Sequence, residues 1–297
     1  MCDAADGRKR KIIGALVLVA RSAALLYVLV CIGLFLGQRR IIFPGAQTQG
    51  TASANVQAPP GTEMLRLETP QGQIVALFGH ALDANGRPRS DAATRPTVIF
   101  FYGNAMCLAD SLDDLDHFRR LGANVLIPEY LGYGMSGGTA GEAGCLATGE
   151  AAYDYVRSRR ALARSPLVVS GWSLGSGPAV DLASRKPVAG LMLFSAFTSL
   201  TDIGRGHFPI LPVSLMLQHR FENVEKIRRV RCPILLAHGD QDEVVPFRMR
   251  DQLAKAAGGP VECITVIGAH HNDILDTGGD MLDARVGEFL GRTVALQ

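Results

Sequence analysis

The sequence predicts an α/β fold, in which a mostly parallel sheet of eight strands is flanked by helices. Short apolar runs bounded by turn residues alternate with longer segments of helical periodicity, and this alternation is the first observation behind the prediction. The second is that strands joined through crossover helices lie parallel to one another. The third is size, because 297 residues with 47% hydrophobic content suffice for one large domain and an appendage.

The N-terminal region has the composition of a membrane anchor. Basic residues 8–11 precede the apolar segment 12–37, which as a helix would rise about 39 Å, more than a hydrocarbon layer of about 30 Å. Arg21 interrupts this segment at a cost of about 2.5–3.5 kcal/mol, which the surrounding Leu, Val and Ile residues offset; alternatively the buried part begins at Ser22. A cleaved signal peptide and a buried core helix remain alternatives, although no small-x-small cleavage site closely follows Gly37.

These boundaries divide the chain into a basic segment 1–11, a single-pass transmembrane anchor 12–37, a linker 38–60 and a domain 61–297. The linker is expected because residues 46–60 are uncharged and rich in Gln, Thr, Ala and Gly. Four Lys/Arg before the anchor and two soon after it favour a cytoplasmic N-terminus and a periplasmic or lumenal domain. The net charge of +2 gives no reason to expect a nucleic-acid partner, and the oligomeric state stays undetermined.

The elements of the domain follow from its apolar runs. The first two strands are expected to form an antiparallel pair that turns at Gln71-Gly72, and the later strands are separated by helices. The predicted strands are 64–68, 73–78, 97–101, 124–127, 167–170, 188–194, 233–238 and 261–267, and the predicted helices are 111–121, 142–159, 174–185, 247–257 and 280–294. The less regular insert 195–230 is a short cap, which leaves the cleft open. Its apolar stretch 208–217 either lines a pocket or packs on the sheet.

Two stretches match the pattern G-x-S-x-G, in which a serine sits on a sharp turn between strand and helix. Gly171 to Gly175 lies between an apolar strand and a helical run, so Ser173 is the candidate nucleophile. Gly134 to Gly138 follows a loop and runs into more glycine, so Ser136 is expected to be a loop residue. The flanking glycines are a steric requirement, because strand and helix approach closely at such a turn.

Partners for this serine are expected at the carboxyl ends of the neighbouring strands. The turn 238–246 after one predicted strand carries acidic residues, and the turn 268–273 after the next carries histidines. The resulting chain order is Ser, Asp, His, which is the order of a nucleophile, an orienting acid and a base in this architecture.

With these motifs the chain resembles the α/β-hydrolase family, and in particular its small-capped, membrane-tethered esterases and lipase-like proteins. The motifs that carry the resemblance run in family order from about residue 63 to the C-terminus and are Tyr102-Gly103-Asn104-Ala105, Glu129-Tyr130-Leu131-Gly132-Tyr133-Gly134, Gly171-Trp172-Ser173-Leu174-Gly175, residues 196–200, 238–246 and 268–273.

The resemblance implies a role for each matching residue. Ser173 is the nucleophile, His271 the general base and Asp242 the residue that orients His271. The backbone N–H groups of Leu174 and Asn104 form the oxyanion hole, with Gly103, Gly171 and Gly175 as motif glycines. No metal is expected, since the histidines lack metal-ligand spacing. The hydrolase chemistry that the resemblance implies also needs no organic cofactor.

Several positions leave alternatives open. Asp240 and Glu243 compete with Asp242, and His270, where the family usually has glycine, competes with His271. His238 resembles a structural histidine of its turn. The cysteines of the domain are expected to be unpaired thiols, but a bridge between Cys232 and Cys263 is also considered.

Three residues depart from the family pattern. Tyr102 stands where histidine is usual, Glu129 where aspartate is usual and Leu131 where arginine is common. None belongs to the expected triad, and the oxyanion donors are backbone groups. We therefore expect these departures to affect loop geometry and substrate fit.

The function expected from this resemblance is that of a membrane-anchored serine hydrolase. It would cleave acyl esters or thioesters through an acyl-enzyme, with lipids or acylated proteins as substrates suggested by the anchor. An aminoacyl or peptidyl hydrolase and a catalytically silent scaffold are the alternatives.

Overall fold

The computed structural model describes residues 2–295, with side chains described over residues 13–294. Helix α1 (Cys2–Ile42) leads into the sheet domain. The strands are β1 (Thr62–Thr69), β2 (Gly72–Gly79), β3 (Thr97–Phe101), β4 (Asn124–Pro128), β5 (Leu167–Trp172), β6 (Gly190–Phe194), β7 (Ile234–Gly239) and β8 (Val261–Val266). The helices after α1 are α2 (Leu112–Arg120), α3 (Glu142–Ser158), α4 (Ser176–Arg185), α5 (Leu200–His207), α6 (Val213–Met216), α7 (Asn223–Lys226), α8 (Arg248–Ala256) and α9 (Ile274–Ala295).

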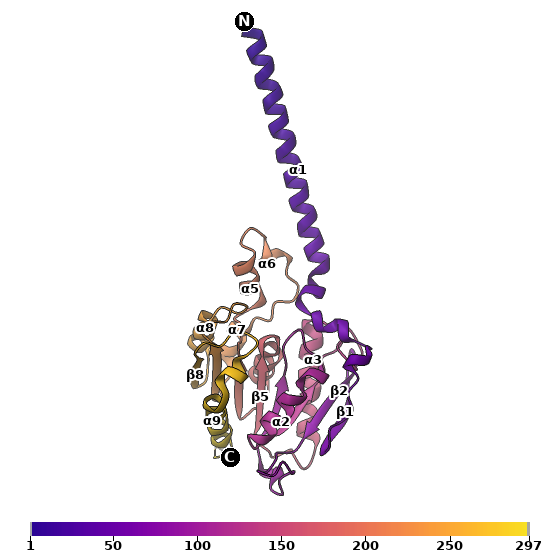
Figure 1. Cartoon of the computed structure of the whole chain (residues 1–297), viewed down its shortest axis with the longest axis vertical. Helices are drawn as coiled ribbons and strands as arrows, with labels where there is room; N and C mark the ends of the chain where they lie inside the picture. The colour runs from indigo at the N-terminus through magenta and orange to yellow at the C-terminus, as the bar shows by residue number, and fades with distance from the viewer. Residues whose placement is uncertain (1, 296–297) are drawn as a thin grey trace.

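The eight strands form one sheet in the order β1-β2-β4-β3-β5-β6-β7-β8. Strand β2 is antiparallel to both of its neighbours, and β3 to β8 are parallel (Figure 1). This is the predicted fold class, which the structure confirms. The consequence for function is that the carboxyl ends of β3, β5, β7 and β8 open onto the same edge of the sheet.

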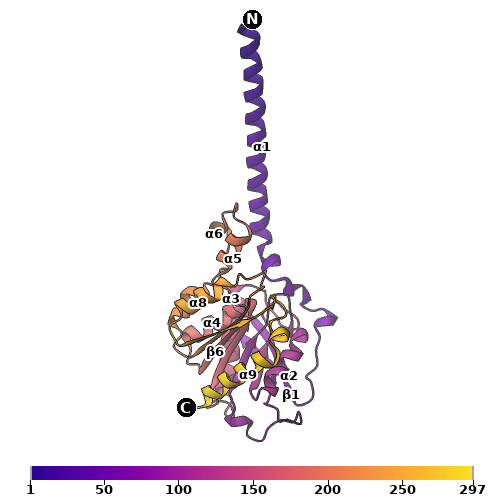
Figure 2. The same ribbon diagram turned by 60° about the vertical axis from the view of Figure 1, so that its left-hand side comes forward.

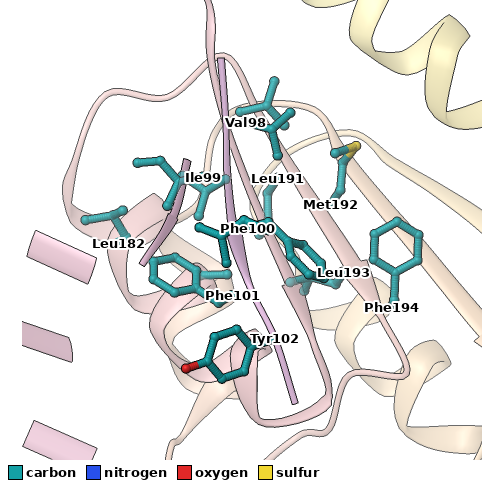
Figure 3. Close-up of a cluster of buried hydrophobic side chains, with 14 of the residues drawn as sticks. Val98, Ile99, Phe100, Phe101, Tyr102, Leu182, Leu191, Met192, Leu193 and Phe194 are labelled. Carbon is teal, nitrogen blue, oxygen red and sulfur yellow. The ribbon is translucent and has the colours of Figure 1, made fainter. Parts of the chain in front are cut away.

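Helices cover both faces of the sheet. Helices α2 and α9 share one face, where His117 Nε2 lies 3.0 Å from an Asp283 carboxylate oxygen, and α3, α4 and α8 cover the other (Figure 2). Figure 3 shows how a strand serves both layers, since Ile99 and Phe101 point to the side of Leu182 from α4, whereas Phe100 points to the opposite side. These side chains are buried because β3 lies in the middle of the sheet.

Helix α1 extends farther from the sheet than any other described helix. It rises away from the sheet as a long rod (Figure 1), and its segment Ile13–Ile42 is long and apolar enough to cross a membrane. The predicted basic segment 1–11 forms its first turns from Cys2 onward, but Met1 and the side chains up to residue 12 lie outside the described part.

The predicted linker 38–60 is partly helical and partly packed on the domain. Residues 38–42 are the last turn of α1, and two short 3₁₀ helices follow at Pro44–Thr48 and Ala52–Ala54. Phe43 is fully buried, with its ring centroid 5.0 Å from that of His219. An uncharged composition therefore did not make this segment a free tether.

Smaller differences concern boundaries and cysteines. The predicted helix 280–294 is the longer part of α9, which bends at Gly279, where φ is 43°.

The disulfide bridge between Cys232 and Cys263, one of the two alternatives for these cysteines, is absent, and both thiols are free. On the neighbouring strand, Cys263 lies opposite Leu236. Because Leu236 comes four residues after Cys232, the two cysteines are about 13 Å apart along the strand direction.

Candidate active site

Ser173 lies on the sharp turn between β5 and α4. Its φ of 51° places it in the left-handed region that non-glycine residues rarely adopt, as expected for a serine held on a strained turn. A Cβ on Gly171 would overlap the backbone of Gly175, and a Cβ on Gly175 would overlap the carbonyl of Phe101. The two motif glycines are thus required by the close approach of α4 to the sheet.

The structure brings together the three residues that the sequence indicated. The Ser173 hydroxyl lies 2.9 Å from His271 Nε2, and His271 Nδ1 lies 2.8 Å from Asp242 Oδ2. With the proton on Nδ1, His271 donates to the carboxylate and accepts from the serine. These side chains come from turns after β5, β7 and β8, so the parallel sheet itself aligns them.

Asp242 is a buried carboxylate with four nitrogen atoms close to its oxygens. Its side chain is fully buried, and the backbone N–H groups of Val244 and Val245 donate to Oδ1 at 2.9 and 2.7 Å. His238 Nε2 lies 3.1 Å from Oδ2. Burial alone would raise the pKa of Asp242, but the hydrogen bonds from His238 and His271 outweigh it and hold that pKa well below its usual range.

The competing residues lie outside this hydrogen-bonded chain. His270 is exposed and pairs with exposed Glu243 at 3.1 Å, and this hydrogen bond raises the pKa of His270. Asp240 accepts a bond from the backbone of Gly268 at 2.7 Å. Ser136 is buried in the loop after β4, where its hydroxyl oxygen accepts from Val75 N–H at 2.9 Å.

The loop after β3 faces the serine and is fastened to the end of α1. The Asn104 carbonyl accepts from Gly45 N–H and from the Tyr133 hydroxyl, both at 3.0 Å, and its side-chain amide donates to the Ile42 carbonyl at 3.2 Å. Asn104 and Leu174, the expected oxyanion residues, line the same cavity as Ser173, together with Gly103. No pattern in the sequence predicted the contribution of α1 to this loop.

Two of the departures from the family pattern are partners in space. The Tyr102 hydroxyl donates to Glu129 Oε1 at 2.7 Å, and the backbone N–H groups of Leu108 and Met135 donate to the same carboxyl group at 2.7 and 3.2 Å. Both side chains are fully buried. Burial raises the pKa of Glu129, and the three hydrogen bonds oppose that rise. The pair joins the loops after β3 and β4.

A cavity of about 530 Å³ adjoins Ser173 and His271. Its walls come from the sheet edge, from the cap and from α1, and they are mostly apolar. The cap and α1 contribute Leu34, Phe35, Gln38, Ile41, Ile42, Leu200, Ile203, Gly204, Phe208, Leu211, Val213, Met216 and Leu217. Trp172 also lines it, and its indole N–H donates to the His271 carbonyl at 3.3 Å. The stretch 208–217 thus lines a pocket, which was one of the two alternatives.

Sequence relatives of this chain include hydrolases by name. An uncharacterised protein of Mycobacterium tuberculosis (strain H37Rv) is 33% identical over 264 residues, which cover 87% of this chain and 89% of that protein. The human alpha/beta hydrolase domain-containing protein 17B is 34% identical over 179 residues, which cover 60% of this chain and 61% of the human protein. No family model matches the chain.

Solved structures agree on the fold. An esterase of Pyrococcus furiosus has a TM-score of 0.64 at 19% identity, covering 80% of this chain and 94% of the esterase. An alpha-beta hydrolase of Vibrio vulnificus has a TM-score of 0.64 at 16% identity, covering 84% of this chain and 91% of that protein. The chain belongs to the α/β-hydrolase family. Membership of this family supports hydrolase activity.

This α/β-hydrolase has features that sequence reasoning missed. The α1 side chains in the cavity, the bond from Trp172 to His271 and the pairing of Tyr102 with Glu129 join residues far apart in the chain. Among the residues whose side chains are described, no group of three or more His, Cys, Asp or Glu is placed to hold a metal ion.

Proposed function

We propose that the protein is a membrane-anchored serine hydrolase that cleaves acyl esters or thioesters through an acyl-enzyme. The observation that carries this proposal is the hydrogen-bonded chain from Ser173 through His271 to Asp242, with distances of 2.9 and 2.8 Å. Such a chain supplies a nucleophile, a general base and an orienting carboxylate in the arrangement that acyl transfer requires.

In the proposed reaction, Ser173 Oγ attacks the acyl carbon while His271 Nε2 takes the hydroxyl proton. Asp242 accepts the hydrogen bond from Nδ1 and stabilises the imidazolium. The backbone N–H groups of Leu174 and Asn104 stabilise the oxyanion. His271 then protonates the leaving alcohol or thiol as its bond to carbon breaks. Water then attacks the acyl carbon while His271 takes one of its protons, and His271 returns that proton to Ser173 Oγ as the bond from Oγ to the acyl carbon breaks and the acid leaves.

An acyl group as the substrate is supported by the walls of the cavity. A volume of about 530 Å³ is within the range of small-molecule sites, and apolar side chains from the cap and from α1 surround the approach to Ser173. The apolar helix Ile13–Ile42 supports an anchor that keeps this cavity close to a bilayer.

The direct test is hydrolysis of p-nitrophenyl esters of two to sixteen carbons by the full-length protein in detergent, with fluorophosphonate labelling of the same preparation. We expect labelling and ester turnover in the wild type and neither in Ser173→Ala. Turnover of aminoacyl amides in place of esters would favour a peptidyl hydrolase. Absence of both labelling and turnover would leave a catalytically silent scaffold.

For the membrane topology we propose that the hydrolase domain lies on the extracytoplasmic side, because more Lys and Arg residues precede the apolar helix than closely follow it. Cys263 is an exposed thiol on β8 and reports the side directly. A membrane-impermeant maleimide added to intact cells should label the wild type and not Cys263→Ser. Labelling of Cys263 only after lysis would show that the domain lies on the cytoplasmic side.

A further inference from the structure

Helix α1 and the cap enclose the cavity together. We name residues 208–217 the cap tip. Gln38 of α1 donates to the Met216 carbonyl at 3.2 Å and accepts from Gln218 N–H at 2.8 Å, and Tyr27 donates to the Ile210 carbonyl at 2.8 Å. Tyr27 and Gln38 are about 16 Å apart along the helix axis. The cap tip therefore runs beside α1, as Figures 1 and 2 show for α6.

The contact with Tyr27 fixes the depth of Ile210, in the cap tip, in a bilayer that α1 spans. A hydrocarbon layer of about 30 Å takes up about 20 helical residues. Counted from the basic residues 8–11, these are residues 12–31; counted back from Arg39 and Arg40, they are residues 19–38. Residue 27 lies inside the hydrocarbon in both placements, at least about 6 Å below its surface on the domain side.

The side chain of Ile210 suits that depth, because it is large, apolar and 79% exposed. Leu215, which precedes Met216 at the other end of the cap tip, is 87% exposed. The contact between Tyr27 and the Ile210 carbonyl places Ile210 beside the exposed apolar residues of α1, so the two elements share an apolar face. In water this face is unfavourable, and in a bilayer it is solvated by acyl chains.

The cavity reaches this face. Phe35 of α1 and Phe208 of the cap tip both line the cavity and are 39% and 53% exposed, so the cavity is bordered by residues that also belong to the surface. Leu34 and Met216 line the same cavity as Ser173. The passage from bilayer to serine is thus walled by apolar side chains of α1 on one side and of the cap on the other.

We propose that the cap tip is embedded in the bilayer and that α1 and the cap tip form the binding site for the acyl chain of a membrane-embedded ester, which reaches Ser173 sideways from the hydrocarbon. This assignment rests on the proposed hydrolase function and names its substrate class. In it, α1 is a wall of the substrate site and not only an anchor.

Blocking the passage tests the binding site. In phosphatidylcholine vesicles, the Leu34→Trp variant of the full-length protein should lower the ratio of p-nitrophenyl palmitate turnover to p-nitrophenyl acetate turnover at least about tenfold relative to wild type. The matched control is Leu36→Trp, because Leu36 is 75% exposed on the same helix and does not line the cavity. Equal effects of the two variants, or equal loss of both substrates, would overturn the acyl-chain site. Absence of acetate turnover in the wild type would instead contradict the proposed function.

The depth of the cap tip is tested without any turnover. Ile210→Trp, at the contact with Tyr27, should gain fluorescence that vesicles of dibrominated phosphatidylcholine quench strongly, above the background of Trp172. The matched control is Val294→Trp, near the C-terminal end of α9 and far from α1 (Figure 1), which should not be quenched. Equal quenching of the two variants would overturn the embedding of the cap tip.

Discussion

Two turns of this molecule share the pattern G-x-S-x-G, and their serines have opposite surroundings. Ser173 faces His271 and the cavity, whereas the Ser136 hydroxyl accepts from Val75 N–H and donates to the Glu129 carbonyl at 3.2 Å. Ser173 has a φ of 51° and follows a strand, and Ser136 lies in a loop. The comparison teaches that the elements before and after the pattern decide whether its serine is available for reaction.

The comparison is tested most strongly by removing each hydroxyl. Ser173→Ala should lower kcat/KM for p-nitrophenyl esters by roughly 10⁴-fold or more, because no other described nucleophile bonds to His271. Ser136→Ala should change kcat/KM by less than about threefold but destabilise the fold by about 1–3 kcal/mol, since Val75 N–H loses its buried acceptor. Ester kinetics and urea unfolding measure the two effects. Equal losses of activity in the two variants would contradict the comparison.

Asp242→Asn should lower kcat by roughly 10⁴-fold, because an amide cannot hold His271 in the tautomer that accepts the serine proton. Asp240→Asn and Glu243→Gln, in the same turn, are the matched controls and should retain activity.

The same carboxylate gives a signed pH dependence. Since the pKa of Asp242 is lowered below its ordinary value of 3.8, its ionisation stabilises the fold above that pH, and this contribution is lost as the pH falls below about 3.8. The free energy of unfolding, measured with urea, should therefore fall more steeply for wild type than for Asp242→Asn as the pH is lowered from 5 to 3. Parallel curves would show that Asp242 is not held as a carboxylate.

The glycines of the two turns sharpen the comparison further. A Cβ on Gly175 would overlap the Phe101 carbonyl, whereas a Cβ on Gly137 would only reach ordinary contact with Gln73 at 3.4 Å. Gly175→Ala should cost about 1–3 kcal/mol of stability and most of the activity, because α4 must shift away from β3. Gly137→Ala should be close to neutral. Thermal melts and ester turnover of the pair measure the difference.

The smallest effect is expected at the buried pair that joins the two loops. Tyr102→Phe removes one of three donors to Glu129, so it should destabilise the fold by about 1–2 kcal/mol and leave kcat within a few-fold of wild type. Unfolding by urea with ester kinetics on the same samples checks both numbers. A large loss of kcat would give Tyr102 a direct part in catalysis.

The fold was predictable because its signals are local. Apolar runs such as 97–101 and 167–170 specify buried strands, and the helical segments between them specify parallel connections. Ser173, Asp242 and His271 were predictable for a related reason, since parallel strands bring turns 98 residues apart to a common edge. Both predictions needed only the order of elements.

What the sequence did not reveal depends on tertiary contacts. Nothing in the uniformly apolar composition of α1 distinguishes Leu34, which lines the cavity, from Leu36, which is exposed. Tyr102 and Glu129 were recognised separately as departures, but their compensation is visible only where the side chains meet. The contact from Tyr27 to Ile210 joins residues 183 positions apart and has no local signal.

The buried position of Phe43 determines where this protein can be cut. A soluble fragment that starts at Gln57, where composition changes, would lose Phe43 from the core and the bond from Gly45 to Asn104 beside Ser173. Emptying a site of that size costs about 3–5 kcal/mol, a large part of the stability of a typical domain. A truncated protein that keeps its core therefore has to begin no later than Phe43, directly after the last turn of α1, so the apolar helix and the sheet domain follow one another without a dispensable linker.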